Sequence, residues 1–463
     1  GIRSDSDMYS FSFGFRPWKS PQRFGNGADI QQYLEETAAE LGITDHVRFQ
    51  TTVLAADWDS ARAVWKITLG RTHDEYRGHV PGHRPDTSAP KVVPGSEFTL
   101  TARYLIGCTG YYKYDAPHWP TFPGQEQFKG EIVHPQFWDP KTSVEGKDIV
   151  VVGSGATAVT IVPAVAAAGA KSVVMLQRTP SYLAPIPRSS MAYAFGMKLA
   201  VLFPVAWTIQ LVRFLHIFES WLLFKLARRY PHIVKKRLND AWELALGGSE
   251  ALEKQRPHLT PPYEPWDQRI CAMPGADLLK CVRRNEVEIV TDRIAAVTES
   301  GVRLESGRVL PADIIVPATG LTLAACGGLP VTIDGVRTPN GDRYPYRSGA
   351  MTCDIPNFFS IMGYLNGSWA TKADLVAFFA ARVIGEAESR NARQVVPRCP
   401  PEMQAKGERM TGHWNSGYIQ RAIAANEVPY QGAADPFKVH HDYFRDYKAL
   451  VFGSVREKHL IYA

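Results

Sequence analysis

The alternation of hydrophobic and polar positions predicts a strand–helix–strand unit in the middle of the chain. Ile149–Val152 form a β-branched run bounded by charge and glycine, which is typical of a strand buried on both faces. An apolar, alanine-rich run over Ala156–Ala170 predicts the helix that follows. Ser172–Leu176 predict a second strand, so the order of elements is that of a parallel α/β sheet.

The turn between the first strand and the helix holds the pattern G-x-G-x-x-A, made by Gly153, Gly155 and Ala158. The first glycine permits a tight turn, the second lets a pyrophosphate approach the backbone, and the small third residue lets the helix pack close to the strand. The helix N-terminus, which includes Thr157, is a natural site for an anion. The set indicates a dinucleotide-binding unit; a glycine turn in another kind of α/β unit is the alternative.

The end of the second strand indicates which nucleotide binds. An NAD site usually carries an acidic residue about 20 residues past the glycines, where it bonds the ribose 2′-hydroxyl. Gln177, Arg178 and Thr179 stand at that place here. Because a guanidinium pairs with a 2′-phosphate that a carboxylate would repel, Arg178 predicts NADP(H).

The same patterns predict further elements on both sides of this unit. Asn26–Leu41 has helical spacing, whereas Val47–Trp58 and Ala63–Leu69 alternate like antiparallel strands. The other predicted elements are strands at Phe98–Ile106, Val287–Val290, Asp313–Val316 and Phe358–Tyr364, a hairpin of Val302–Leu304 with Arg308–Leu310, and helices at Gly275–Arg284 and Lys372–Ile384.

An apolar segment at about residues 191–240 stands out from this pattern. Leu199–Val212 carry no charge, but the run is shorter than the roughly 20 residues of a spanning helix and contains Pro204. Basic residues follow from Arg228 to Arg237. The segment predicts either helices that cover the nucleotide domain or a partner subunit, or an amphipathic segment that lies on a membrane with its basic residues toward lipid headgroups.

Composition limits the class of protein. A chain of 463 residues is long enough for two or three domains, and 45% hydrophobic with 21% charged residues is typical of a folded globular protein. The net charge of +6 is mild and gives no reason to expect nucleic acid as a partner. Six scattered cysteines without a C-x-x-C pair favour a reducing cytoplasm over a disulfide framework or a metal site.

Two strands end in similar turns, L-I-G-C-T-G at Leu105–Gly110 and I-V-P-A-T-G at Ile315–Gly320. Thr109 with Gly110, and Thr319 with Gly320, would let the chain pass close to a cofactor, although either turn alone could be an ordinary strand-to-loop glycine. Together they predict a flavoprotein of the α/β class with two Rossmann-like dinucleotide-binding domains. The expected division is an FAD-binding domain in residues 1–115, an NADP-binding domain in 116–312 with the helical insertion, and the return of the FAD-binding domain in 313–463.

A fingerprint directly before the glycine-rich unit identifies a family. F-K-G-E-I-V-H-P-Q-F-W-D resembles the F-x-G-x-x-x-H-x-x-x-W-[P/D] signature of Baeyer–Villiger monooxygenases, a branch of the flavin-containing monooxygenases. Stretches such as G-S-G-A-T-A-V-T, P-W-D-Q-R and S-W-x-x-K-A-D-L-V resemble the thioamide-oxidising branch that activates ethionamide. The matched fingerprint positions are Phe128, Gly130, His134, Trp138 and Asp139.

The resemblance implies a reaction and two catalytic residues. NADPH would reduce bound FAD, O2 would add to give a C4a-peroxyflavin, and one oxygen would enter a ketone to give an ester or lactone, or oxidise the sulfur of a thioamide or sulfide. The family's arginine falls on Arg269 and the carboxylate that positions it on Asp5. Gln268 stands where many relatives carry a lysine that helps to hold the 2′-phosphate.

Each of these side chains also has a plainer interpretation. Arg269 could instead form a surface ion pair with Asp267 or Glu264, and Asp5 could be a turn or cap residue. For His134 we favour a role in organising the connecting segment over proton transfer, and for Trp138 we favour packing over catalysis.

One departure from the family concerns the start of the chain. A complete member begins with a strand, G-x-G-x-x-G and a helix that hold FAD; on the order of 50 residues of such a βαβ unit are expected before Gly1 and are absent here. The alternatives to a Baeyer–Villiger enzyme are therefore a flavin monooxygenase acting mainly on sulfur or nitrogen, and an NADP-binding remnant without flavin activity. The expected substrate is small and hydrophobic, the expected location is cytoplasmic with a possible peripheral membrane contact, and the sequence sets no oligomeric state.

Overall fold

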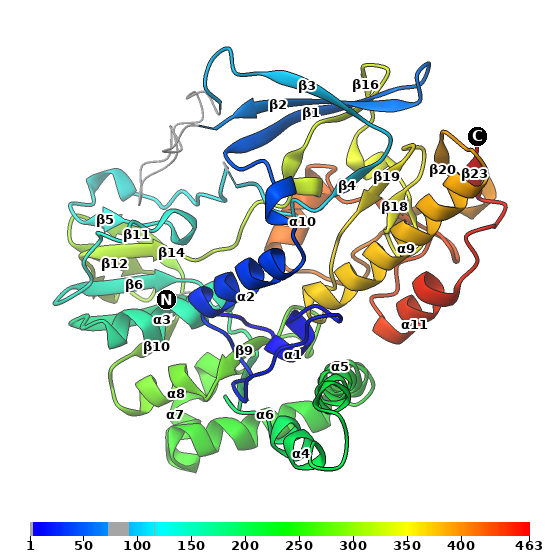
Figure 1. Cartoon of the computed structure of the whole chain (residues 1–463). Helices are drawn as coiled ribbons and strands as arrows, with labels where there is room; N and C mark the ends of the chain where they lie inside the picture. Colours follow the sequence, from blue (N-terminus) through cyan, green and yellow to red (C-terminus); the bar gives the residue numbers. More distant parts are fainter. Residues whose placement is uncertain (1–2, 73–91, 115) are drawn as a thin grey trace.

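The computed structural model describes residues 3–72, 92–114 and 116–463. A parallel sheet in the strand order β10-β7-β6-β14-β5 lies toward the left of Figure 1. The strands are β5 (Glu131–Ile132), β6 (Asp148–Val152), β7 (Ser172–Gln177), β10 (Glu288–Thr291) and β14 (Ile314–Pro317). The predicted strand–helix–strand unit is confirmed as β6, α3 (Ala156–Ala167) and β7.

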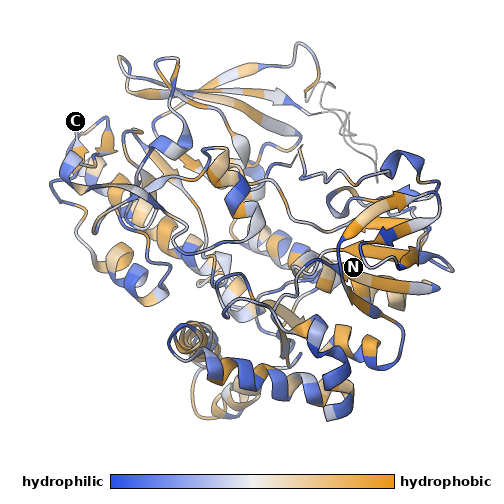
Figure 2. Ribbon diagram, turned by 180° about the vertical axis from the view of Figure 1, so that it is seen from behind, coloured by the Kyte–Doolittle hydropathy of each residue, from blue (hydrophilic) through white to orange (hydrophobic). Residues whose placement is uncertain are grey.

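Both faces of this sheet are buried, as the apolar runs predict. In β6, Ile149 and Val151 pack with α3 and α8 (Asp277–Arg283), whereas Val150 and Val152 pack on the opposite face. That second face is covered by an antiparallel sheet of β11 (Ile294–Thr298), β12 (Gly301–Leu304) and β13 (Val309–Pro311), where the sequence predicted only a hairpin. Figure 2 shows hydrophobic colour along the central strands.

The position of β14 differs from the expected domain division. β14 pairs with β6 in parallel, with Ile314 opposite Ile149 and Val316 opposite Val151. A boundary at residue 313 would therefore cut a central strand from its own sheet. We propose that the first domain junction stays near residue 115 and that the second follows β14.

A second core lies around helix α9 (Trp369–Ser389), on the side of Figure 1 opposite the parallel sheet. Its sheet has the order β17-β18-β19-β4, with β17 (Pro345–Tyr346), β18 (Met351–Thr352), β19 (Phe358–Ser360) and β4 (Leu105–Gly107). The prediction of one strand over Phe98–Ile106 is wrong. Its first half, β3 (Phe98–Ala102), belongs to another sheet, and the chain changes sheets at Arg103 and Tyr104.

The sheet that contains β3 forms the top layer in Figure 1. Its order is β16-β15-β1-β2-β3, with β1 (Thr51–Asp59), β2 (Val64–Arg71), β15 (Val331–Ile333) and β16 (Val336–Arg337). Trp58 and Trp65, fully buried, pack together at its base. Outside these sheets lie helices α1 (Met8–Phe11), α2 (Gly27–Glu40), α10 (Gly417–Ala424) and α11 (Tyr443–Tyr447). Three strand pairs are also present: β8 (Leu183–Ile186) with β9 (Cys271–Pro274), β20 (Val395–Pro397) with β23 (Leu460–Tyr462), and β21 (Gln404–Arg409) with β22 (Tyr430–Gly432).

The apolar segment forms a helical insertion at the bottom of Figure 1. It contains α4 (Met191–Leu199), α5 (Val205–Arg229), α6 (Pro231–Leu246) and α7 (Ser249–Leu259), so it extends beyond the expected limit of residue 240. The ion pairs that tie α5 to the body include Arg213 with Asp374 on α9 and Arg23 with Glu219, each at 2.7 Å. Among the described residues, none of the helices combines the length and apolarity needed to cross a bilayer.

The two segments that follow the Thr-Gly turns lie side by side. Lys113 N donates to Thr322 O and Ala324 N donates to Tyr111 O, each at 2.9 Å, in a short antiparallel bridge. The segment that leads into the domain of the parallel sheet therefore lies next to the segment that leads out of it.

Candidate active site

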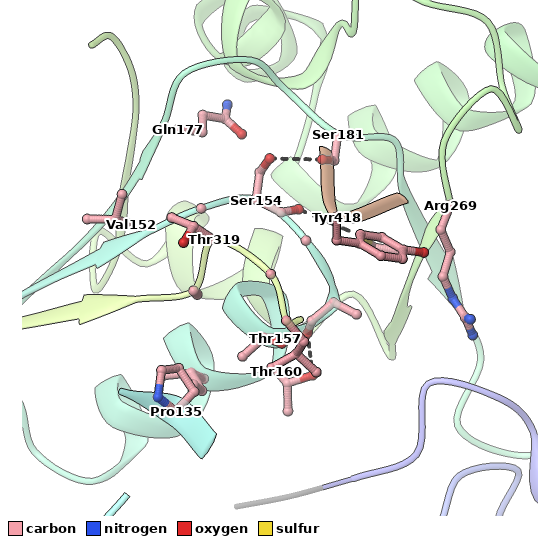
Figure 3. A pocket seen from close by; sticks show the side chains of 18 of the residues that line it. Pro135, Val152, Ser154, Thr157, Thr160, Gln177, Ser181, Arg269, Thr319 and Tyr418 are labelled. Atoms are coloured by element: carbon pink, nitrogen blue, oxygen red, sulfur yellow. Dashed lines mark hydrogen bonds between the residues drawn. The ribbon is translucent and has the colours of Figure 1, made fainter. Parts of the chain in front are cut away.

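A cavity of about 1760 Å³ lies where the parallel sheet, the N-terminal segment and α10 meet. This volume exceeds the roughly 300–1,000 Å³ of a typical small-molecule pocket, so it has room for more than one ligand. Of the predicted site residues, those on its wall are Asp5, Trp138, Gly153, Gly155, Thr157, Arg178, Thr179, Gln268, Arg269, Thr319 and Gly320. The turn after β6, the start of α3 and the turn after β14 form one side of it (Figure 3).

The glycine turn has the geometry that the pattern predicts. Gly153 has φ +134°, and a Cβ there would lie 2.4 Å from Ala318 O, so only glycine fits. Gly155 caps α3, and a Cβ on it would meet nothing within 4 Å, which leaves the backbone open to the cavity. Ala158 is fully buried and lets α3 pack on the sheet.

The end of β7 presents Arg178 to the cavity. Arg178 is exposed and makes no ion pair with any residue that the structure describes, so its guanidinium is available to a ligand. Gln177 does not compete with it, because its buried amide donates to His258 O at 2.7 Å and to Thr291 Oγ1 at 2.9 Å. Thr179 O accepts a hydrogen bond from Ser154 at 3.1 Å, which joins this end of β7 to the glycine turn.

The two Thr-Gly turns relate to the cavity differently. Thr319 lines it, and its Oγ1 is buried without a hydrogen-bond partner among the described residues, which marks a position where a ligand would complete the bonding. Thr109 and Gly110 do not line this cavity, although Tyr111 and Tyr112, directly after them, do.

Arg269 and Asp5 meet at the cavity wall. Arg269 Nη2 lies 2.9 Å from Asp5 Oδ2, and both side chains are about one-third exposed, at 32% and 38%. The alternative partners of Arg269 are occupied, because Asp267 pairs with Arg228 at 2.6 Å and Glu264 with Lys235 at 2.7 Å.

Asp5 is not the cap of the neighbouring helix. Asp7 fills that role, since it accepts a hydrogen bond from Ser10 N at 2.9 Å at the start of α1. The Asp5 carboxylate is thus left to the guanidinium of Arg269 and to one long contact, at 3.4 Å, with the Ser6 hydroxyl.

The surroundings of Arg269 keep its guanidinium charged, and they keep the nearby tyrosines neutral. The Asp5 carboxylate raises the pKa of Arg269 above its usual value. Burial raises the pKa of Tyr418 to about 12 and that of Tyr111 in the same direction. In Figure 3 the Tyr418 hydroxyl points toward Arg269. The arrangement can therefore hold a fixed positive charge among phenols at neutral pH, which suits the stabilisation of a reacting anion.

The fingerprint begins with residues that build the edge of the sheet. A Cβ at Gly130 would lie 2.3 Å from Asp313 O, because β5 pairs closely with β14. Phe128 packs into the core on the face that β11–β13 cover. These two positions act through packing, not through contact with the cavity.

The remaining fingerprint residues organise the connecting segment. His134 is buried, its Nδ1 accepts from Gln136 N at 3.2 Å, and its ring stacks on Trp119. Burial lowers the pKa of His134 to about 4, so it is neutral at pH 7. Asp139 Oδ1 accepts from Lys141 N at 2.8 Å and closes a turn, while Trp138 packs on the core and also lines the cavity.

Comparison with known proteins places this architecture. A family model described as FMO-like, flavin-binding monooxygenase-like, matches residues 101–234. FAD-containing monooxygenase EthA of Mycobacterium tuberculosis is 37% identical over 463 residues, covering 100% of this chain and 88% of that protein. Probable FAD-binding monooxygenase AlmA of Acinetobacter baylyi is 37% identical over 450 residues, covering 97% of this chain and 84% of that protein.

The chain belongs to the flavin-binding monooxygenases. Solved structures similar to this monooxygenase include cyclohexanone monooxygenase with ε-caprolactone (TM-score 0.67, 18% identity) and oxidised steroid monooxygenase bound to NADP (TM-score 0.66, 19% identity). Each alignment covers 100% of this chain and 90% of the other. The predicted membership of the flavin-containing monooxygenases is thus confirmed, as is the α/β fold with two dinucleotide-binding domains.

Several cavity residues of this monooxygenase were not predicted. Tyr111 stacks on Trp369, with ring centroids 4.3 Å apart, and donors and aromatic rings from α10 complete that side. A sequence signal was available for three of them. Tyr111 and Tyr112 directly follow Thr109 and Gly110, and Trp369 lies in S-W-x-x-K, one of the stretches that resemble the family. Further unpredicted residues on the cavity wall include Arg293, Ser416, Tyr418 and Arg421.

Proposed function

We propose that this chain is an FAD- and NADPH-dependent monooxygenase that inserts one oxygen of O2 into small hydrophobic ketones, with an ester or lactone as product. We include the oxidation of sulfur in thioamides and sulfides in the same proposal. The observation that carries it is the ion pair of Arg269 with Asp5, which sets a guanidinium on the wall of the cavity that the glycine turn opens into.

The residues at the parallel sheet fit NADPH. The open backbone at Gly155 and the N-terminus of α3 suit a pyrophosphate. Arg178, which forms no ion pair within the described residues, suits a 2′-phosphate. Gln268, also on the wall, adds an uncharged donor where a lysine is usual in the family. Selectivity for the phosphorylated coenzyme then rests on Arg178 with Thr179.

The cavity also has features that fit a flavin. The unsatisfied Thr319 hydroxyl and the aromatic wall of Tyr111 and Trp369 offer a donor and flat apolar surface of the kind that a ring system contacts. The crystal structure of OTEMO, an enzyme of similar fold, is a complex with FAD and NADP together. When bound, the two cofactors would supply the electrons and the activated oxygen of the reaction.

The chain's own residues then have distinct tasks. The Arg269 guanidinium provides a permanent positive charge that stabilises negative charge developing on the transferred oxygen. Asp5 positions that guanidinium and keeps it protonated. The half-buried phenols of Tyr111 and Tyr418 help to exclude water without adding charge.

The test compares Arg269→Ala with wild type and with Arg284→Ala, which removes an exposed arginine that pairs with Glu286. NADPH oxidation, O2 uptake and product from a cyclic ketone and from a thioamide are measured together. We expect Arg269→Ala to oxidise NADPH with hydrogen peroxide as the main product, while Arg284→Ala behaves as wild type. Full ester formation in Arg269→Ala would contradict the proposed role. Wild type that oxidises the thioamide but never the ketone would instead establish a sulfur-directed enzyme.

The proposed location is the cytoplasm, in line with the free cysteines found throughout the described residues. A contact with the membrane depends on a different part of the molecule, the helical insertion, and the oxygenation proposed above does not require it.

A further inference from the structure

The hairpin of α4 and α5 carries a dense group of exposed apolar side chains. We name it the apolar tip; its members are Met191, Phe195, Val201, Leu202, Phe203, Val205 and Trp207. Val201 is 85% exposed, Leu202 77% and Trp207 71%, although side chains of this kind are usually buried. Figure 2 shows hydrophobic colour along this pair of helices, at the margin of the molecule. Single exposed apolar residues need no explanation, but a contiguous group marks a contact surface.

The tip is supported by a rigid base. The opposite side of α5 is buried and includes Thr208, Ile209 and Val212. A Cβ at Gly196 would lie 2.7 Å from Val212 Cγ2, so α4 packs tightly on α5. Arg213, anchored to Asp374 at 2.7 Å, fixes the hairpin to α9. The apolar side chains are therefore displayed by an ordered element of the fold.

The apolar tip itself carries no acidic side chain, and two lysines lie beside it. The sequence contains no aspartate or glutamate from Ile149 to Phe218. Lys198, at the end of α4, is exposed and forms no ion pair within the described part of the chain. Tyr193 on α4 donates to Lys19 O at 3.0 Å, which brings a second exposed lysine and its loop beside the hairpin.

We propose that the apolar tip inserts into the headgroup region of an anionic lipid bilayer, with Lys198 and Lys19 contacting the lipid phosphates. Lysines next to an apolar surface that contains a tryptophan match the chemistry of such an interface. None of the described helices is able to cross the bilayer, so the hairpin lies in one leaflet. A second copy of the chain is a poorer occupant, because a symmetric contact would bring the lysines of both copies together with no acid on the tip to receive them.

The test is co-sedimentation of the full chain with vesicles of phosphatidylcholine alone or mixed with phosphatidylserine. We expect wild type to pellet with the mixed vesicles and to be released by high salt. Leu202→Glu with Trp207→Glu should lower binding by roughly tenfold or more for each apolar side chain kept out of the bilayer. Lys198→Glu should weaken the preference for phosphatidylserine and leave weak binding to neutral vesicles unchanged.

The matched control is Val336→Glu, which changes a 68% exposed apolar residue on β16, in another sheet. It should pellet as wild type does. NADPH binding by each variant shows that it is folded, and sedimentation velocity without lipid shows its oligomeric state. Wild type that stays in the supernatant with both vesicles would overturn the proposal. So would a wild-type dimer that the tip substitutions convert to a monomer, because the tip would then be a protein interface.

Discussion

Asp5 and Arg269 come from distant parts of the chain, yet Asp5 Oδ2 and Arg269 Nη2 lie 2.9 Å apart. The acids that are near Arg269 in sequence, Asp267 and Glu264, are paired with Arg228 and Lys235. The fold thus selects a remote carboxylate over local ones, which places the pair on the cavity wall. An ion pair of this exposure contributes at most about 1 kcal/mol to stability, so stabilising the fold is not its main role.

Asp5→Asn tests whether the main role of the ion pair is to position Arg269 for catalysis. The amide is close in size to the carboxylate but neutral, so we expect the free energy of unfolding to change by less than about 1 kcal/mol. Oxygenated product should fall by roughly 10- to 100-fold while NADPH oxidation continues, because the guanidinium is no longer held in place. Product yield per NADPH consumed is the measurement. Equal loss of both rates would indicate a general defect instead.

Arg178→Ala tests the recognition of the 2′-phosphate. Losing a charge-assisted contact of about 1.5–3 kcal/mol should raise the KM for NADPH by roughly 10- to 100-fold. The KM for NADH should stay close to its wild-type value, because NADH has no 2′-phosphate. Arg308→Ala, which removes an arginine paired with Glu288, is the control and should change neither constant. A parallel rise in both constants would show that Arg178 contacts another part of the coenzyme.

Local sequence patterns were sufficient to predict the strand–helix–strand unit of the nucleotide domain. The β-branched run, the glycine turn and the alanine-rich helix were each predicted to within a few residues, because each element is specified by its own sequence. The strand predicted over Phe98–Ile106 failed for the opposite reason. No glycine or proline interrupts Phe98–Ile106, and only the tertiary fold shows that its two halves join different sheets.

The site itself was predictable only in part. Arg269 and Asp5 were found through the family resemblance, since no local signal connects them. Tyr418 reaches the cavity from α10, near the other end of the chain, and its neighbourhood depends on packing. Helix α7 was missed because its sequence is polar and carries only two fully buried residues, Leu252 and Leu259, which leaves little hydrophobic period to detect.

Substitutions at the two glycines of the turn should affect different properties, stability at Gly153 and coenzyme binding at Gly155. Gly153→Ala places a Cβ 2.4 Å from Ala318 O at a φ of +134°, so we expect a loss of roughly 2 kcal/mol or more in stability. Gly155→Ala meets nothing within 4 Å and should leave stability within about 0.5 kcal/mol of wild type. Its added methyl group would still occupy the space that a pyrophosphate needs, so NADPH affinity should fall. Chemical denaturation and calorimetric titration with NADPH measure the two effects; unchanged affinity in Gly155→Ala would place the pyrophosphate elsewhere.

His134 should make the protein sensitive to acid. Its pKa is about 4 in the folded chain, because burial disfavours the charged ring, and about 6.5 when unfolded. Between these values the unfolded chain binds the extra proton, so stability falls as the pH drops from about 6.5 to 4, by up to about 1.4 kcal/mol per pH unit from this residue.

His134→Gln isolates this contribution. The amide oxygen can still accept from Gln136 N but does not titrate, so the variant should lose less stability over that interval. The measurement is the free energy of unfolding of each protein, obtained with denaturant at a series of pH values. Burial also lowers the pKa of His441, but that residue is present in both proteins, so its contribution cancels in the difference between them. The free energy of unfolding of the variant relative to wild type should be constant above pH 6.5. It should rise in favour of the variant as the pH falls below 6.5. A difference that stays flat down to pH 4 would show that His134 accepts its proton in the folded state, and the interpretation of a neutral, purely structural ring would then be wrong.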